Sequence, residues 1–95
     1  MECFSVGLTQ HAHERMLERR IHSRDVRRVV HEGQIIEEYP QDQPFPCFLI
    51  LGYARSGPIH VVVARDPKSR RCFVVTVYEP DPKTWENDFR KRRKP

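Results

Sequence analysis

The sequence predicts a single α+β domain, in which a helical hairpin packs on an antiparallel sheet of four or five strands. In residues 9–32 the apolar side chains recur with the spacing of two amphipathic helices. In residues 34–78 they form extended runs separated by short turns, which is typical of an antiparallel meander. The expected order of elements is β-α-α-β-β-β-β-α, and 95 residues are enough for one modest core.

The first helix is expected over residues 9–20. Thr9 is a suitable N-cap, and no glycine or proline interrupts the segment. Ala12 and Met16 lie four residues apart and begin an apolar stripe, with Leu17 at its edge. We therefore expect Ala12 and Met16 to face the sheet.

The second helix is expected over residues 23–32, after a link too short for anything but a helical hairpin. Ser23 is the predicted N-cap, and Gly33 is the predicted residue after the last turn. Val26, Val29 and Val30 have the spacing of one apolar face. This face should pack on the sheet beside the first helix.

Five segments are predicted to be strands. The first alternates apolar and polar residues but is long enough only for a short edge strand. The third is a continuous apolar run, which is typical of a strand buried on both faces. The five segments are residues 3–6, 34–39, 47–53, 59–65 and 70–78.

After the last strand, Asp81 and Pro82 are residue types that favour an N-cap and a first helical position. We therefore predict a short C-terminal helix around Trp85 and Phe89. The basic residues that follow, within 90–95, are expected to fray.

The composition favours a basic globular protein with an acidic partner. The formal net charge is +4 and the pI is about 9.3, which suits nucleic acid, an acidic protein or a membrane surface. No apolar run approaches the ~20 residues that a membrane helix needs. We expect neither a membrane span nor a secretory signal.

Cys3, Cys47 and Cys72 are widely spaced and odd in number. This pattern is typical of reduced thiols rather than of a disulfide framework. We therefore predict three unpaired cysteines and a cytoplasmic location.

Metal chemistry is not indicated. His11 and His13 are separated by about 200° on a helix, so they cannot bind one ion together. The sequence contains neither a Cys-x-x-Cys nor a His-Glu-x-x-His motif. We predict no metal and no cofactor.

The candidate catalytic residues are His11, Arg15, His60 and Tyr78. His11 and Arg15 are four apart, so their side chains should lie side by side on one helix face. Cleavage of RNA without a metal needs a base for the 2′-hydroxyl, an acid for the 5′-oxygen and positive charge over the phosphate. The two histidines are candidates for the proton transfers, while Arg15 or Arg19 would hold the phosphate.

Tyr78 could hold or protonate the leaving group. It should share a face of the last strand with Thr76, while Val75 and Val77 share the other face. His60 has an alternative role, because a histidine at the start of a strand can simply bind a carbonyl or cap the turn at Pro58.

Further basic residues are predicted to contact nucleic acid: Arg19, Arg20, Arg90, Lys91, Arg92 and Arg93. For the C-terminal group, a disordered solubilising tail is an equally good interpretation. Trp85 and Tyr53 either stack on bases or pack against the fold.

Several of these motifs together resemble a widespread bacterial family known as domain of unknown function 4258, over roughly residues 8–85. The His-Ala-x-x-Arg-Met element of residues 11–16 is fairly specific. The other matching features are Thr9, Arg19, Ile21, a capped second helix, Gly33, Tyr39-Pro40, His60-Val61-Val62 and Thr76-Val77-Tyr78-x-Pro80.

The family is similar to the RelE/ParE-like group of small toxins, and its members often lie beside genes for small zinc-finger antitoxins. The resemblance implies a compact RelE/ParE-like domain and a ribonuclease activity. Our hypothesis is therefore a toxin-like, metal-independent endoribonuclease with RNA and a zinc-finger antitoxin as partners. The alternative is a non-catalytic basic module that docks a partner protein or nucleic acid.

Overall fold

The structure is a computed structural model, and it describes residues 1–94. The predicted α+β class is confirmed, with two helices packed on one five-stranded sheet. The elements in chain order are β1 (Ser5–Leu8), α1 (Gln10–Arg19), α2 (Ser23–Glu32), β2 (Gln34–Tyr39), β3 (Cys47–Ala54), β4 (Gly57–Arg65) and β5 (Arg71–Tyr78).

The strands lie in the order β1-β5-β4-β3-β2. Strands β2 to β5 form the predicted antiparallel meander, because each is joined to the next by a short turn. Strand β1 instead pairs in parallel with β5, with Ser5 opposite Arg71 and Leu8 opposite Val74. The helical hairpin then carries the chain from β1 at one edge to β2 at the other.

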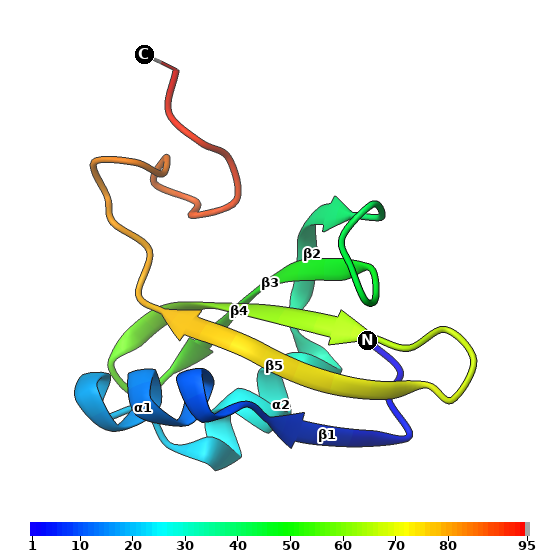
Figure 1. The fold of residues 1–95 in the computed structure, drawn as a ribbon. Helices are drawn as coiled ribbons and strands as arrows, with labels where there is room; N and C mark the ends of the chain where they lie inside the picture. The colour runs from blue at the N-terminus through cyan, green and yellow to red at the C-terminus, as the bar shows by residue number, and fades with distance from the viewer. Residues whose placement is uncertain (95) are drawn as a thin grey trace.

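Both helices cover the same face of the sheet, and the segment after β5 lies on the opposite face (Figure 1). The core forms between the helices and the central strands, where the predicted apolar stripes meet the sheet. Its fully buried members include Ala12, Val26, Val30, Ile50, Ile59, Val61, Val63, Val74 and Val77.

Helix α1 begins as the sequence predicts. The Thr9 hydroxyl accepts a hydrogen bond from the Ala12 amide at 3.1 Å. The same hydroxyl lies 2.9 Å from the Val74 carbonyl and 3.1 Å from the Val75 carbonyl, to which it can donate. The N-cap therefore also fixes the start of the helix to β5.

The ends of α2 differ from the prediction. The N-cap is His22, whose Nδ1 accepts from the Arg24 amide at 3.1 Å, and Ser23 is the first helical residue. Gly33 has an extended backbone rather than a left-handed one. A Cβ there would lie 2.6 Å from a methyl carbon of Ile50, so glycine is required for close approach to β3.

A β-bulge in β5 changes which of its side chains face the core. Val62 of β4 pairs with Thr76, and the next residue, Val63, pairs with Val74, so Val75 is the extra residue. Val74 and Val77 are buried in the core, whereas Val75 is only half-buried. The bulge therefore interrupts the predicted alternation at Val75, and Val77 shares the core with Val74.

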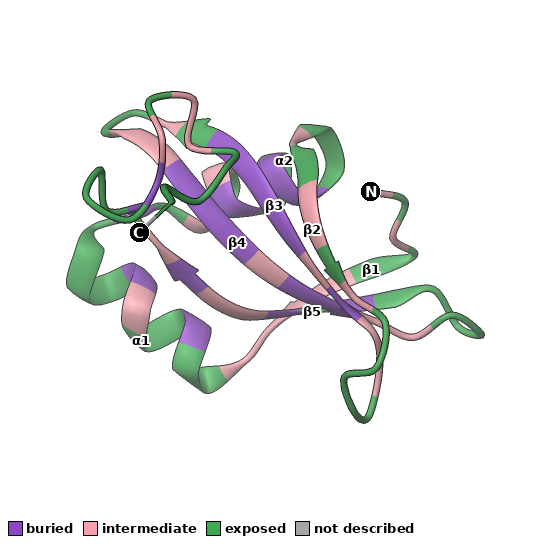
Figure 2. Cartoon of the chain, turned by 90° about the horizontal axis from the view of Figure 1, so that it is seen from above, coloured by how far each residue is buried: buried purple, intermediate pink, exposed green. Residues whose placement is uncertain are grey.

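The predicted C-terminal helix does not form. Thr84 and Trp85 donate to the Asp81 carbonyl in a single turn, and the chain then folds back so that Trp85 bridges Arg92. We call residues 79–94 the C-terminal strap. Trp85 is 2% exposed, and Figure 2 shows the strap passing over the buried part of β4. Burial of the indole on the sheet outweighs continuation of a short helix.

Residues 90–94, for which the sequence predicts fraying, make defined contacts with the rest of the chain. Arg92 binds Glu37 of β2 at 3.2 Å and lies 4.6 Å above the ring of Trp85. Arg93 donates to the Pro82 carbonyl at 2.8 Å and to the Asn87 side chain at 3.1 Å. Pro95 lies outside the described residues.

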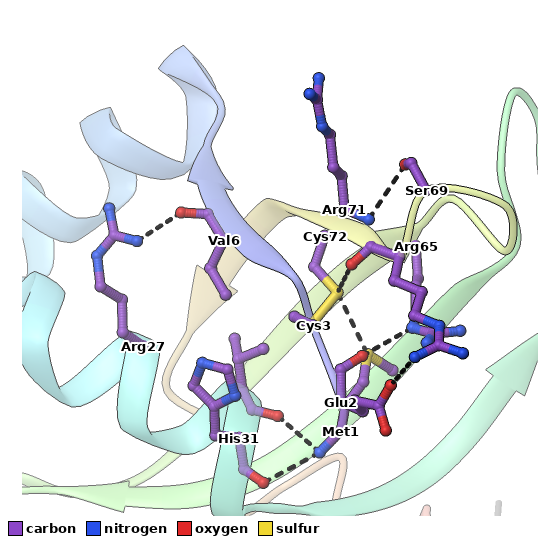
Figure 3. The surroundings of a disulfide bond; sticks show 12 residues. Met1, Glu2, Cys3, Val6, Arg27, His31, Arg65, Ser69, Arg71 and Cys72 are labelled. Carbon is purple, nitrogen blue, oxygen red and sulfur yellow. Dashed lines mark hydrogen bonds and ion pairs between the residues drawn. A yellow bond between two sulfur atoms is a disulfide. The ribbon is translucent and has the colours of Figure 1, made fainter.

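Cys3 and Cys72 form a disulfide, with their Cα atoms 5.7 Å apart (Figure 3). The parallel pairing of β1 with β5 brings them together across 69 residues of sequence. The prediction of three unpaired thiols was therefore wrong, and only Cys47 is a free thiol, buried in β3. The cytoplasmic prediction loses the argument that rested on reduced cysteines.

Candidate functional site

His11 and Arg15 lie on an accessible face of α1, as the sequence predicts. His11 is exposed, and its Nε2 lies 3.1 Å from the hydroxyl oxygen of Thr76. Thr76 lies where β5 has passed the end of β1, so this edge of β5 has no partner strand there. Arg15 is held by Glu18, with Nη1 2.7 Å from the carboxylate. His11 therefore presents an exposed imidazole, whereas the charge of the Arg15 guanidinium is partly neutralised by Glu18.

His60 is fully buried on the opposite face of the sheet. Its Nε2 lies 2.8 Å from the Phe89 carbonyl, so this nitrogen donates, and Nδ1 accepts from the Tyr78 hydroxyl at 3.2 Å. The Trp85 ring covers it edge to face at 4.5 Å. Burial lowers the pKa of His60, which keeps the imidazole neutral.

Tyr78 shares its face of β5 with Thr76, as predicted, because these residues lie opposite His60 and Val62 of β4. Burial raises the pKa of Tyr78, so the phenol stays protonated. His60 and Tyr78 therefore hold the strap against the sheet, and both ring nitrogens of His60 are occupied. His11 and His60 bond to different residues of β5: His11 contacts Thr76, and His60 contacts Tyr78, two residues further along the strand.

The strap also joins β2 through a small polar cluster of Glu37, Tyr39 and Arg92. Burial disfavours ionisation of Glu37, but hydrogen bonds from Tyr39 and Arg92 outweigh it and hold the pKa of the carboxyl below its usual range. Of the basic residues predicted to bind nucleic acid, Arg92 and Arg93 are thus used to fix the strap. Arg90 and Lys91 remain exposed.

A second concentration of positive charge lies where the α1–α2 link meets the β3–β4 turn. Four arginine side chains from three segments line one hollow of about 630 Å³. We call this hollow the arginine pocket. Its arginines are Arg20, Arg24, Arg28 and Arg55, and its wall includes Tyr53.

Only one carboxylate lines the arginine pocket. Asp25 pairs with Arg28 at 2.5 Å, and this hydrogen bond lowers the pKa of the aspartate. Within residues 1–94, no carboxylate lies within 4.0 Å of the guanidinium groups of Arg20, Arg24 or Arg55. The pocket therefore carries a net positive charge that the protein itself does not neutralise.

Two special backbone positions present these arginines. Arg20 ends α1 in the left-handed conformation, with φ 55° and ψ 39°, where glycine is normally preferred. Gly57 has φ 124° and closes the two-residue turn that carries Arg55. The left-handed backbone of Arg20 is strained for a residue that has a side chain, and such strain is often kept at functional positions.

Sequence reasoning identified Arg20 but missed its partners. Arg24 and Arg28 of α2 and Arg55 of the β3–β4 turn were not among the predicted site residues. Each of these arginines is a weak signal in the sequence by itself, because the three segments that carry them come together only in the folded sheet and helix arrangement. The packing of α2 along β3 brings the helical link and the β3–β4 turn to the same pocket. Arg19 is exposed in the last turn of α1 and does not line the pocket.

In the described part of the chain, no group of three or more His, Cys, Asp or Glu side chains is arranged to hold a metal ion. None of the described helices is long and apolar enough to cross a membrane.

Comparison with known proteins identifies the family. No curated protein and no solved structure matches the chain. The model of the family described as Domain of unknown function (DUF4258) matches residues 8–79, which are most of the sequence, and the protein therefore belongs to that family.

Proposed function

We propose that the protein binds RNA through the arginine pocket. The observation that carries this proposal is the convergence of four arginines from three segments on one hollow that contains a single carboxylate. A guanidinium matches phosphate oxygens in charge and geometry, and it can bind two of them at once. The chain's net charge of +4 acts in the same direction at longer range.

We choose RNA among polyphosphates on the expectation that the family is similar to the RelE/ParE-like group of small toxins. The proposal implies a cytoplasmic location, because that is where RNA is found. A binding role does not require His11 and His60 to lie in one site. DNA or an acidic protein remains an outcome that the experiment below distinguishes.

The experiment measures binding of a labelled mixed-sequence RNA at several salt concentrations. Arg24→Gln and Arg55→Gln should each weaken binding and reduce the slope of log affinity against log salt by about 1. Arg71→Gln is the matched control, because Arg71 is exposed at the start of β5, at the other end of the sheet. Equal losses in all three variants, or tighter binding to DNA or an acidic protein than to RNA, would contradict the proposal.

A second candidate function is metal-independent ribonuclease activity, and the His11–Thr76 pair favours it. His11 is exposed, its ring touches a hydroxyl, and Arg15 lies one turn further along the helix. His60 is a weaker candidate for proton transfer to RNA, because it is buried and both of its ring nitrogens are bonded. Tyr78 would have to serve as the acid.

The test is cleavage of RNA in EDTA. His11→Ala should lower the rate by about 10²–10⁴, which is the usual contribution of a positioned acid or base, and should leave RNA binding nearly unchanged. His13→Ala, also exposed on α1, is the control. If the wild type leaves RNA intact, the binding function stands alone. A toxin–antitoxin role depends on this activity, and a small zinc-finger antitoxin encoded by the neighbouring gene would support it.

A further inference from the structure

Tyr53 stands between two hollows of different chemistry. On one side is the arginine pocket, and on the other is a smaller hollow of about 330 Å³. Tyr53 and Arg28 line both. Tyr53 is 57% exposed, although residues 49–52, which precede it in β3, are all buried. Such exposure is unusual for a large aromatic side chain.

Most residues that line the smaller hollow are uncharged. Its charged residues are Glu32 and Arg28, and Arg28 is already bound to Asp25 and to the Tyr53 carbonyl. Val29, Leu51, Gly33 and Gly52 contribute apolar side chains or bare backbone. Gln34 adds an amide that can both donate and accept hydrogen bonds. Glu32 supplies a carboxylate, which would repel a phosphate. This side of Tyr53 is therefore suited to a flat, uncharged, polar-edged group, and phosphate is favoured only on the arginine side.

We propose that the ligand is single-stranded RNA, with a phosphate in the arginine pocket and the adjoining base stacked on Tyr53 in the smaller hollow. This inference rests on the proposed function and specifies its substrate class. A base presents its face to a protein only when it is unstacked, so a duplex cannot make this contact. The two hollows share a wall, as a phosphate and its own base require.

The Tyr53 platform is held in place before any ligand arrives. Nη2 of Arg28 donates to the Tyr53 carbonyl at 2.5 Å, and Nη1 of the same arginine binds Asp25 at 2.5 Å. Tyr53 also pairs with Pro58 in the β3–β4 ladder. A pre-ordered backbone reduces the entropy lost on binding, so more of the stacking energy is retained as affinity.

The experiment compares a short labelled RNA, single-stranded and in duplex, on the full chain. The wild type should bind the single strand more tightly. Tyr53→Ala should weaken single-strand binding by about 5- to 150-fold, which corresponds to one stacked base, without changing the salt slope. Tyr53→Phe should bind like the wild type, and Phe4→Ala, which removes another exposed aromatic ring, should have no effect.

A second measurement uses the same RNA with abasic sites throughout. The wild type should lose the affinity that Tyr53→Ala loses, and Tyr53→Ala itself should bind both RNAs equally. Equal binding of single strand and duplex, or wild-type affinity in Tyr53→Ala, would overturn the stacking inference. If Arg24→Gln and Arg55→Gln still weaken binding in that case, the proposed function survives, and if they do not, both proposals fail.

Discussion

Gly52 of β3 lies directly beneath Val29 of α2. A Cβ at position 52 would come within 2.4 Å of one methyl carbon of Val29 and within 2.5 Å of the other. The helix therefore packs on the strand at a distance that only glycine permits. Because α2 also carries Arg24 and Arg28, this contact determines where half of the arginine pocket lies.

Gly52→Ala should lower the free energy of unfolding by about 1–3 kcal/mol, since the added methyl overpacks a buried contact. Val29→Ala alone should cost about 1–3 kcal/mol by leaving a cavity. The double variant should lose clearly less than the sum of the two, because the smaller side chain makes room for the methyl group. Urea unfolding measures all three, and additive losses would show that the two residues do not constrain one another.

Arg20→Gly should separate stability from binding. Glycine removes the strain of a left-handed backbone at the end of α1, so the variant should be more stable by about 1 kcal/mol. It should also bind RNA more weakly, because the pocket loses a guanidinium. Thermal unfolding and RNA titration check the two effects. Arg19→Gly is the comparison, since position 19 is helical and there glycine should destabilise. A less stable Arg20→Gly would contradict the strain argument.

Acid should loosen the strap. The pKa of His60 is lowered by burial, so the unfolded chain binds this proton more readily than the folded one. The stabilising effect of neutral His60 is therefore complete above about pH 6.5 and is lost as the pH falls from there through the folded-state pKa. Glu37, whose pKa is lowered, loses its contribution only at more acidic pH.

Unfolding in urea at pH 7.5 and pH 5.5, followed by the fluorescence of Trp85, tests this. Trp85 is the single tryptophan of the chain and covers the His60 ring, so its signal reports on the strap. The wild type should be less stable at pH 5.5, and His60→Gln should show a smaller difference between the two pH values. Equal pH dependence in both proteins would show that His60 is not its source.

Opening the Cys3–Cys72 disulfide should lower the free energy of unfolding by about 4 kcal/mol, as expected for a loop of this length. Thiol titration of the unreduced, denatured protein should give one thiol, from Cys47. The double variant Cys3→Ser with Cys72→Ser should unfold like the reduced wild type. Three thiols in the unreduced protein would restore the reduced state that the sequence suggested.

The helices and the meander were predictable from the sequence because they depend on local patterns. Val26, Val29 and Val30 repeat with a helical period, and the runs that form β3 and β4 are unbroken between turns. These patterns require burial on one side or both, and the packed structure satisfies them.

The remaining features depend on contacts between distant residues. The bulge at Val75 has no local sequence signal, and the strap is extended because Trp85 finds a buried place over His60. The disulfide depends on the parallel pairing of β1 with β5, which no pattern within either strand specifies. The arginine pocket likewise depends on three separate segments. His11 and Arg15 were recognisable because both belong to one helix face.

The disulfide also sets how the molecule would respond to a pulling force. It closes residues 3–72 into a covalent ring that contains both helices and strands β1 to β4. Tension applied to the two ends of the chain would pass from Cys3 to Cys72 through the sulfur atoms and bypass everything inside the ring. The load would fall on most of β5 and on the strap, which would separate from the rest of the fold. The length of chain that unfolds under force would be limited to the residues outside the ring. After reduction, the same force would reach every strand.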